Sequence, residues 1–250
     1  MKKLYFLLLT SLYFPCMVFS QGNIRDSVIH TSLVTLSYSY QFPGGDLAKR
    51  FLSNSTIGAS YLYKTRKNWL IGGDGFFMFR DTIKEQGLFK SISTTDGNII
   101  DGNGIYADLH SYERGYYVGP KIGKVFPVWG PNKNSGIIVL VGAGFLQHKI
   151  RIENSDNAAP QIKGDYKKGY DRLTNGVALS EFVGYLYLGN SRLVSFFAGF
   201  EMVQAWTKNK RFNFDTMSTD NTKRFDILNG FRIGWVVPLY KVAPQKYYYY

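Results

Sequence analysis

The chain has 250 residues, of which 45% are apolar, 17% aromatic and only 19% charged, and its formal net charge is +12. This composition excludes a disordered chain, which would be poor in aromatic residues, and a single cysteine excludes a disulfide-dense fold. After residue 20, no stretch reaches the roughly 18 continuous apolar residues that a membrane-spanning helix needs. The length suits one domain with a sizeable core.

The first 20 residues have the pattern of a signal peptide. Lys2 and Lys3 precede a short apolar run, and we expect cleavage after Ser20. An uncleaved membrane anchor is the alternative, although polar residues interrupt the run. Cleavage removes Cys16, the only cysteine of the sequence, and so excludes disulfides, thiolate zinc sites and cysteine nucleophiles from the mature chain.

From residue 34 onward, apolar and polar residues alternate with a period of two, which predicts β-strands. One face of each segment carries large apolar and aromatic side chains, whereas the opposite face carries glycines, small polar residues and single charges. Eight such segments follow one another, at approximately 34–42, 56–64, 69–80, 116–126, 139–148, 178–188, 194–202 and 225–239.

The sixth segment has no unambiguous apolar face. If Glu181 is kept off the lipid-facing side, Ala178, Phe182, Leu186 and Leu188 point outward. We adopt this orientation because a charged side chain that faces lipid is costly.

The polar faces decide the fold class. A soluble β-sandwich would expose charged residues on one face and pack its aromatic rings inside. Here the polar faces hold many glycines and few lysines, which is typical of a membrane barrel with an apolar exterior and a polar interior. Aromatic residues at the strand ends are expected to form girdles at the two interfaces, and they are Tyr40, Tyr63, Trp69, Phe126, Trp129, Tyr187, Trp206 and Tyr240.

Connection lengths support the same fold class. Long polar connections at roughly 43–54, 81–111, 154–173 and 207–224 alternate with short ones at 65–68, 127–135 and 189–191. Long outer loops and tight periplasmic turns are the pattern of outer-membrane barrels. The sequence therefore predicts an all-β, eight-stranded antiparallel up-and-down transmembrane β-barrel over residues 21–240, located in the cell outer membrane. A periplasmic tyrosine-rich tail at 241–250 is expected to follow it.

The strand alternation places several charged residues inside this narrow barrel. Asp74, Glu181 and Glu201 are expected to pair there with Lys121 and Arg232, and Glu113 is a further candidate. Two interpretations of these charges remain: a structural plug of ion pairs, and a gated path for protons or ions. A wide pore conflicts with the narrow interior of an eight-stranded barrel, which has room only for its own side chains.

The last segment contains Gly230, Phe231, Ile233 and Trp235, which resemble the terminal signal that the barrel-assembly machine reads. On this architecture the chain resembles small outer-membrane barrels of the OmpA-transmembrane and OmpX type. Residues 41–46 and 164–171 resemble a barrel family of Bacteroidota. In that phylum small barrels serve in outer-membrane machines, so this resemblance implies an accessory subunit of a secretion or barrel-assembly complex.

Enzyme and metal functions have weaker support. His110 lies beside Asp108 and Ser111, and it is a candidate for a lipid-modifying site if it approaches His148. Ordinary polar residues at the rim explain the same pattern. The aspartates and glycines within 96–104 do not match the spacing of a calcium loop and predict turns. We expect no catalytic residue, no metal and no cofactor.

The remaining candidates concern binding. The fourth long connection is basic and aromatic, which favours contact with lipopolysaccharide phosphates or a partner, with a solvated loop as the alternative. Tyr247, Tyr248, Tyr249 and Tyr250 are expected to contact a partner or the membrane surface. We therefore predict a structural or accessory subunit with lipid, lipopolysaccharide and protein partners, and no nucleic acid. The alternative is a free-standing barrel for lipopolysaccharide binding or narrow-channel transport.

Overall fold

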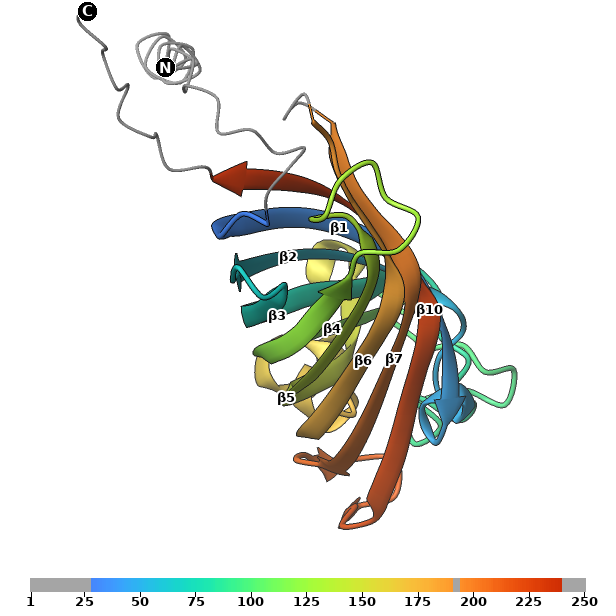
Figure 1. The fold of residues 1–250 in the computed structure, drawn as a ribbon. Coiled ribbons are helices and arrows are strands. Elements are labelled where there is room, and N and C mark those ends of the chain that lie inside the picture. Colours follow the sequence, from blue (N-terminus) through green and yellow to red (C-terminus); the bar gives the residue numbers. More distant parts are fainter. Residues whose placement is uncertain (1–27, 191–193, 240–250) are drawn as a thin grey trace, which may run out of the picture. The chain divides into compact units, whose positions relative to one another are not determined.

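The computed structural model describes residues 28–190 and 194–239, in which eight long strands form a closed barrel. Every neighbouring pair is antiparallel, and the last strand pairs with the first and closes the sheet (Figure 1). The predicted eight-stranded antiparallel up-and-down barrel is confirmed. The strands are β1 (Thr31–Gly45), β2 (Asn54–Lys64), β3 (Trp69–Arg80), β4 (Leu109–Phe126), β5 (Gly136–Asn154), β6 (Thr174–Leu188), β7 (Ser195–Asn209) and β10 (Lys223–Leu239).

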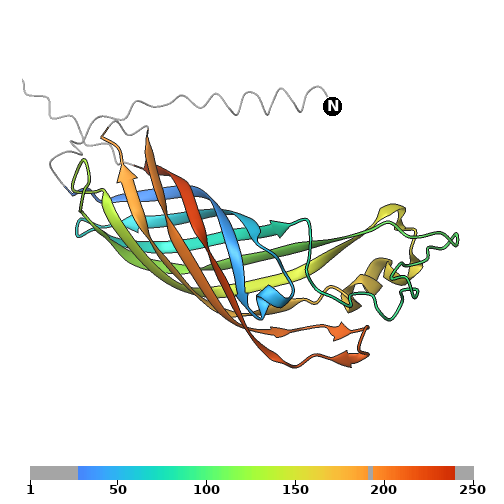
Figure 2. The same cartoon turned by 90° about the vertical axis from the view of Figure 1, so that its right-hand side faces the viewer.

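Long and short connections gather at opposite ends of the barrel, as Figure 2 shows. The long ones are named here L1 (46–53), L2 (81–108), L3 (155–173) and L4 (210–222), and together they form the cap. They contain short 3-10 helices at Leu47–Lys49, Ser155–Asn157, Pro160–Ile162 and Gly164–Gly169, and a small hairpin of β8 (Phe212–Asn213) and β9 (Ser218–Thr219). No helix of the described residues is long and apolar enough to cross a membrane.

The barrel exterior is apolar along its middle, as the alternation predicts. Leu36, Ile57, Val118 and Phe231 are examples of large side chains that are more than half exposed on the outer face. Of the predicted girdle residues, Tyr63, Trp69 and Phe126 are exposed near the short turns, whereas Tyr40 and Trp206 are exposed toward the cap. Such an exterior requires a covering of lipid, because contiguous apolar surface of this extent is not left in water.

Strand β6 has the opposite orientation to the one predicted. Phe182, Leu186, Leu188 and Ala178 are buried in the lumen, and Glu181 is exposed on the outer face. The burial pattern of the strand alternates with these four residues inside. The prediction was wrong because it assumed a polar lumen.

Two glycines beside Phe182, one on β6 and one on the neighbouring β7, explain this orientation. A Cβ at Gly184 or Gly199 would lie 2.7–2.8 Å from the Phe182 ring, so the two glycines leave the space that the ring fills. Phe197 packs edge-on against the same ring, with the centroids 5.5 Å apart. The apolar face of β6 therefore finds a complementary surface inside the barrel.

The predictions that concern the chain ends lie outside the described residues. These are the signal peptide at 1–20, Tyr240 and the tail with Tyr247 to Tyr250. The third short connection, at 189–191, lies only partly within the described residues.

Candidate functional site: the filled lumen and the loop cap

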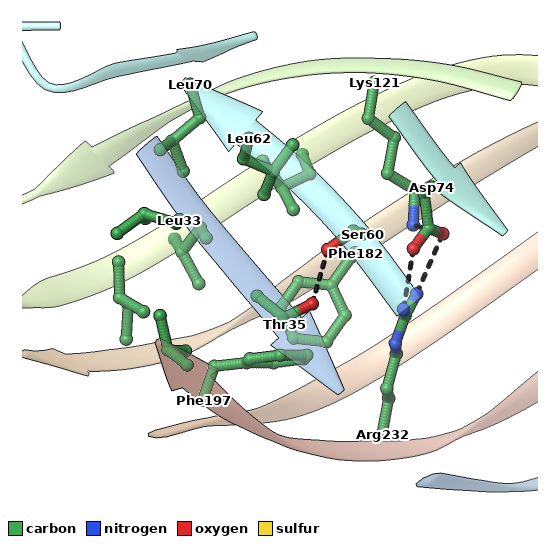
Figure 3. A pocket seen from close by; sticks show the side chains of 14 residues that line it. Leu33, Thr35, Ser60, Leu62, Leu70, Asp74, Lys121, Phe182, Phe197 and Arg232 are labelled. Atoms are coloured by element: carbon green, nitrogen blue, oxygen red, sulfur yellow. Dashed lines mark hydrogen bonds and ion pairs between the residues drawn. The ribbon is translucent and has the colours of Figure 1, made fainter. Parts of the chain in front are cut away.

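Four charged side chains form a closed network in the middle of the lumen. Lys121 Nζ lies 2.7 Å from Asp74 Oδ2 and 2.9 Å from Glu201 Oε1. Arg232 donates to Asp74 Oδ1 at 2.7 Å and to Glu201 Oε1 at 2.7 Å, and its Nε donates to Ser37 Oγ at 3.0 Å. Figure 3 shows Asp74, Lys121 and Arg232 pointing toward one another from different strands.

Two cations and two carboxylates make this network neutral if all four are charged. Each of the four side chains is almost fully buried, so the ion pairs are fixed in place. Four of the five residues predicted for the lumen network therefore meet, and Glu181 does not belong to it. Glu113 also points inward, but it accepts a hydrogen bond from Asn54 Nδ2 at 2.9 Å rather than joining the four.

Apolar side chains fill the lumen between this network and the short turns. Leu33, Leu62, Leu70, Phe182 and Phe197 belong to one buried cluster there. The space left among them is about 20 Å³, which is room for about one water molecule (Figure 3). The sequence did not indicate this packing, because the inward positions of several strands carry glycine, serine or threonine.

The turn at 127–135 covers the adjacent barrel mouth. Asn132 Nδ2 donates to the Leu188 carbonyl oxygen at 2.7 Å, and Asn132 Oδ1 accepts from the Asn134 backbone N–H at 2.9 Å. The buried Lys64 Nζ donates to Asn134 Oδ1 at 2.9 Å and to the Ile29 carbonyl oxygen at 3.1 Å. Polar groups of the turn and the strand ends therefore close the lumen beneath the apolar cluster.

Two arginines join all four loops of the cap. Arg172 of L3 donates to Glu85 of L2 at 3.0 Å and to Asp215 of L4 at 2.6 Å. Arg50 of L1 lies 3.3 Å from the other oxygen of Glu85 and 3.9 Å from Asp220 of L4. Because both guanidinium groups are largely buried, the loops form a folded cap rather than four independent segments.

Electrostatics keep Asp220 of this network ionised. Burial opposes ionisation of its carboxyl group, but hydrogen bonds from Thr222 and Arg224 outweigh burial and lower its pKa below the usual range. Burial lowers the pKa of Arg50, and Glu85 acts in the opposite direction.

A buried polar cluster lies on the lumen side of L1, and sequence reasoning missed it. His148 Nε2 lies 3.0 Å from Asp226 Oδ2, which also accepts a hydrogen bond from Thr207. Phe51 of L1 packs edge-on over the imidazole ring. His148, Thr207 and Asp226 come from strands β5, β7 and β10, so only the closed sheet brings the three residues together.

The two candidate histidines do not meet. His148 is buried in the lumen, whereas His110 is exposed and lies near Asp108, with 3.8 Å between Nδ1 and Oδ1. In the register of β4 and β5, His110 pairs with Glu153 and His148 pairs with Gly115. The histidine pair expected for a lipid-modifying site is therefore absent from this arrangement.

The aspartates of L2 form turns, as predicted. Asp101 Oδ1 accepts hydrogen bonds from the backbone N–H groups of Asn103 at 2.7 Å and Ile105 at 3.0 Å. Gly97 and Gly104 have positive φ angles, which suits glycine. Within residues 28–190 and 194–239, no group of three or more histidine, cysteine or acidic residues is placed to hold a metal ion.

An open groove crosses the surface of the cap between L2, L3 and L4. Its volume is about 540 Å³, and Ile92, Gln161, Tyr166, Phe214 and Met217 line it together with Ser91 and Tyr170. Tyr166 is 62% exposed and Met217 is 72% exposed. Exposed aromatic and thioether groups beside an amide are suited to bind a partner with both apolar and polar groups.

Basic residues of like charge lie opposite each other where the strands approach the cap. In the register, Arg114 of β4 pairs with Lys149 of β5, and Lys208 of β7 pairs with Lys223 of β10. Lys149, Lys208 and Lys223 are exposed and make no hydrogen bond or ion pair with any other described residue. We name these four residues and the exposed Arg151 the basic belt. Like charges directly opposite each other on neighbouring strands repel, so Lys208 and Lys223 favour a bound anion, whereas Arg114 already lies 3.7 Å from Asp81 Oδ1.

Comparison with known proteins finds similar folds only. No protein-family model and no curated protein matches the chain. The crystal structure of Neisserial surface protein A is similar with a TM-score of 0.46 and 12% identity over 82% of this chain and 96% of that one. Ail of Yersinia pestis, crystallised with the heparin analogue sucrose octasulfate, has a TM-score of 0.41 and 13% identity over 83% and 98%. OprG of Pseudomonas aeruginosa has a TM-score of 0.37 and 10% identity over 86% and 99%.

Proposed function

We propose that the protein is a closed outer-membrane scaffold that acts through its surfaces, as an accessory subunit of an outer-membrane complex, rather than as a channel or an enzyme. The single observation that carries this proposal is the filled lumen, in which the network of Lys121 and Arg232 lies above a packed apolar cluster. A barrel that transports no solute can function through its outer surfaces, which it holds in a fixed position for binding other molecules.

The cap supports a binding role. The four loops are joined by the ion pairs of Arg50 and Arg172, so a surface built on them is preorganised, which lowers the entropic cost of binding. The groove lined by Tyr166 and Met217 is the surface that we assign to a partner. A non-catalytic role agrees with the separation of His110 and His148.

Co-purification in several mild detergents tests this function. We expect the tagged mature chain to elute with other outer-membrane proteins at stoichiometric yield. Replacing both Tyr166→Ala and Met217→Ala is expected to weaken that association without reducing the amount of folded barrel. As a matched control, Tyr106→Ala removes another exposed aromatic ring, 63% exposed, from L2 outside the groove. A chain that migrates alone under all conditions contradicts the subunit role.

A second candidate function is binding of lipopolysaccharide by the basic belt. With the loops outside, the belt lies beside the outer leaflet, where phosphate groups neutralise opposed cations. We expect Lys208→Ser with Lys223→Ser to reduce the affinity of the purified barrel for lipopolysaccharide about tenfold, with a weaker dependence on salt. Lys67→Ser, in the turn at the opposite end, is the control and is expected to bind normally. Equal affinity of the Lys208→Ser, Lys223→Ser double variant and the Lys67→Ser control for lipopolysaccharide contradicts this role.

A further inference from the structure

Lys124 is an isolated cation on the outer wall of the barrel, close to the short turns. It lies two residues before the end of β4, and the other outward residues of this strand between 116 and 126 are uncharged. In the register it lies between Trp69 of β3 and Val139 of β5. Lys124 makes no hydrogen bond or ion pair with any described residue, so the described part of the chain supplies no counterion for it.

Two aromatic rings hold the ammonium group of this lysine. Lys124 Nζ lies 5.5 Å from the centroid of the Trp69 ring and 5.7 Å from the centroid of the Phe126 ring. Both rings are exposed on the outer wall, and such cation–π contacts favour one direction of the lysine side chain. Aromatic rings at strand ends lie at the level of the lipid headgroups. Lys124 therefore presents its charge to headgroups rather than to hydrocarbon.

The neighbouring strands add hydrogen-bond donors at the same end of the wall. Tyr63 is the last residue but one of β2, Trp69 is the first residue of β3, and both are exposed. Neither the Tyr63 hydroxyl nor the Trp69 indole N–H has a hydrogen-bond partner among the described residues. The indole and ammonium groups only donate, and the hydroxyl can donate. Three adjacent strands therefore offer free donors to a group that is rich in acceptors.

The turn end of the barrel carries no carboxylate within the described residues. Asp and Glu are absent from residues 28–36, 60–73, 122–140, 182–190, 194–200 and 233–239. A zwitterionic headgroup such as phosphoethanolamine brings an ammonium group that needs an acceptor, and Lys124 repels it. A headgroup that has a phosphate and no cation meets only donors. The charge of this end therefore favours a phospholipid with a net negative charge.

We propose that Tyr63, Trp69 and Lys124 form a binding site for the phosphate group of an anionic glycerophospholipid. A lipid fits both parts of this surface, because its acyl chain covers the exposed Ile71 and Ile122, which pair with each other on the same wall. With the loops outside, the site faces the periplasmic leaflet, whereas the basic belt lies beside the outer leaflet. The site requires a barrel in a membrane, as the proposed function does, but it requires no protein partner.

Native mass spectrometry of the purified, folded barrel tests this site. The barrel is incubated in detergent with an equimolar mixture of dioleoylphosphatidylglycerol and dioleoylphosphatidylethanolamine. We expect phosphatidylglycerol to be retained about fivefold more than phosphatidylethanolamine, because only the first headgroup lacks a cation. Equal retention of the two lipids overturns the site, and so does a species of twice the chain mass that carries no lipid.

Variants locate the retained lipid on the barrel. Lys124→Gln is expected to reduce retention of phosphatidylglycerol about fivefold, whereas Lys124→Arg keeps the charge and is expected to retain it. Lys133→Gln removes an exposed lysine from the turn at 127–135 and is the matched control, with retention equal to that of the wild type. Heat-modifiable mobility reports folding of each variant.

Two results with the folded variants overturn the site. One is unchanged retention in Lys124→Gln, and the other is an equal loss in Lys133→Gln. Both leave the scaffold function intact, because co-purification with other outer-membrane proteins tests that function separately. Conversely, a barrel that migrates alone but retains phosphatidylglycerol through Lys124 contradicts the subunit role and supports the lipid site.

Discussion

Arg232 donates to Ser37, Asp74 and Glu201, and together with Lys121 it balances two buried carboxylates. Removing one partner of a buried ion pair is far more costly than replacing the whole pair, because it leaves a charge without compensation. The lumen network is therefore a place where a single substitution has a large effect on stability.

Replacing Arg232→Gln leaves Asp74 and Glu201 with Lys121 as their only cation in the network. We expect the free energy of unfolding, measured by urea titration of the purified barrel, to fall by about 3–5 kcal/mol. The double variant Arg232→Gln with Asp74→Asn restores charge balance and is expected to recover part of the loss. Equal stability of the single and double variants would show that charge balance is not what the network provides.

Asp220 gives the cap a defined response to pH. Its folded pKa lies below the ordinary value, so its contribution to cap stability is present above an unfolded pKa of about 3.9 and is lost as the pH falls through the lowered value. Protection of L4 amides from hydrogen exchange is therefore expected to be unchanged between pH 7 and pH 5.

Asp220→Asn is the matched variant for this response. It removes the carboxylate that pairs with Arg224 and one of the two that lie near Arg50, so we expect faster exchange in L4 at both pH values. A wild-type cap that loses protection at pH 5 as strongly as the variant would disagree with the lowered pKa.

Strand β6 shows that the alternation of apolar and polar residues is not always sufficient to predict which face of a strand points into the lumen. Its two faces both carry apolar residues, so the sequence alone leaves two orientations, and the charge of Glu181 favoured the wrong one. The deciding contact is with Gly199 of β7, which is adjacent to β6 only through the pairing of the sheet. In the other seven strands the predicted orientation is confirmed, although β5 also carries large apolar residues such as Ile138, Leu140 and Ile150 on its inward face.

Gly199→Ala tests the contact that orients β6. An added Cβ would lie 2.7 Å from the Phe182 ring and closer still to the Val183 carbonyl oxygen, so the ring or the backbone must move. We expect overpacking to lower the free energy of unfolding by about 1–3 kcal/mol. Gly73→Ala is the control, because its Cβ would meet only the Gly119 carbonyl oxygen, at 3.8 Å. Similar losses in both variants would count against the packing of Phe182 as the cause.

At the scale of the whole molecule, strand pairing was predictable and the contents of the lumen and cap were not. A two-residue period and alternating connection lengths are local properties, and they are sufficient to specify eight antiparallel neighbours. The contacts of Arg50 with Glu85 and of His148 with Asp226 join residues far apart in the sequence, so no local pattern contains them. Four lumen residues were found because a charge on an inward face needs a partner.

Conductance of the purified barrel in a planar lipid bilayer tests the central claim, that side chains fill the lumen, most directly. The network of Asp74, Lys121, Glu201 and Arg232 and the apolar cluster beneath it leave no continuous space for hydrated ions. We expect the current to stay at the level of the protein-free membrane at moderate voltage. Steady, ohmic steps of porin size that increase in number with the amount of folded protein would contradict a filled lumen.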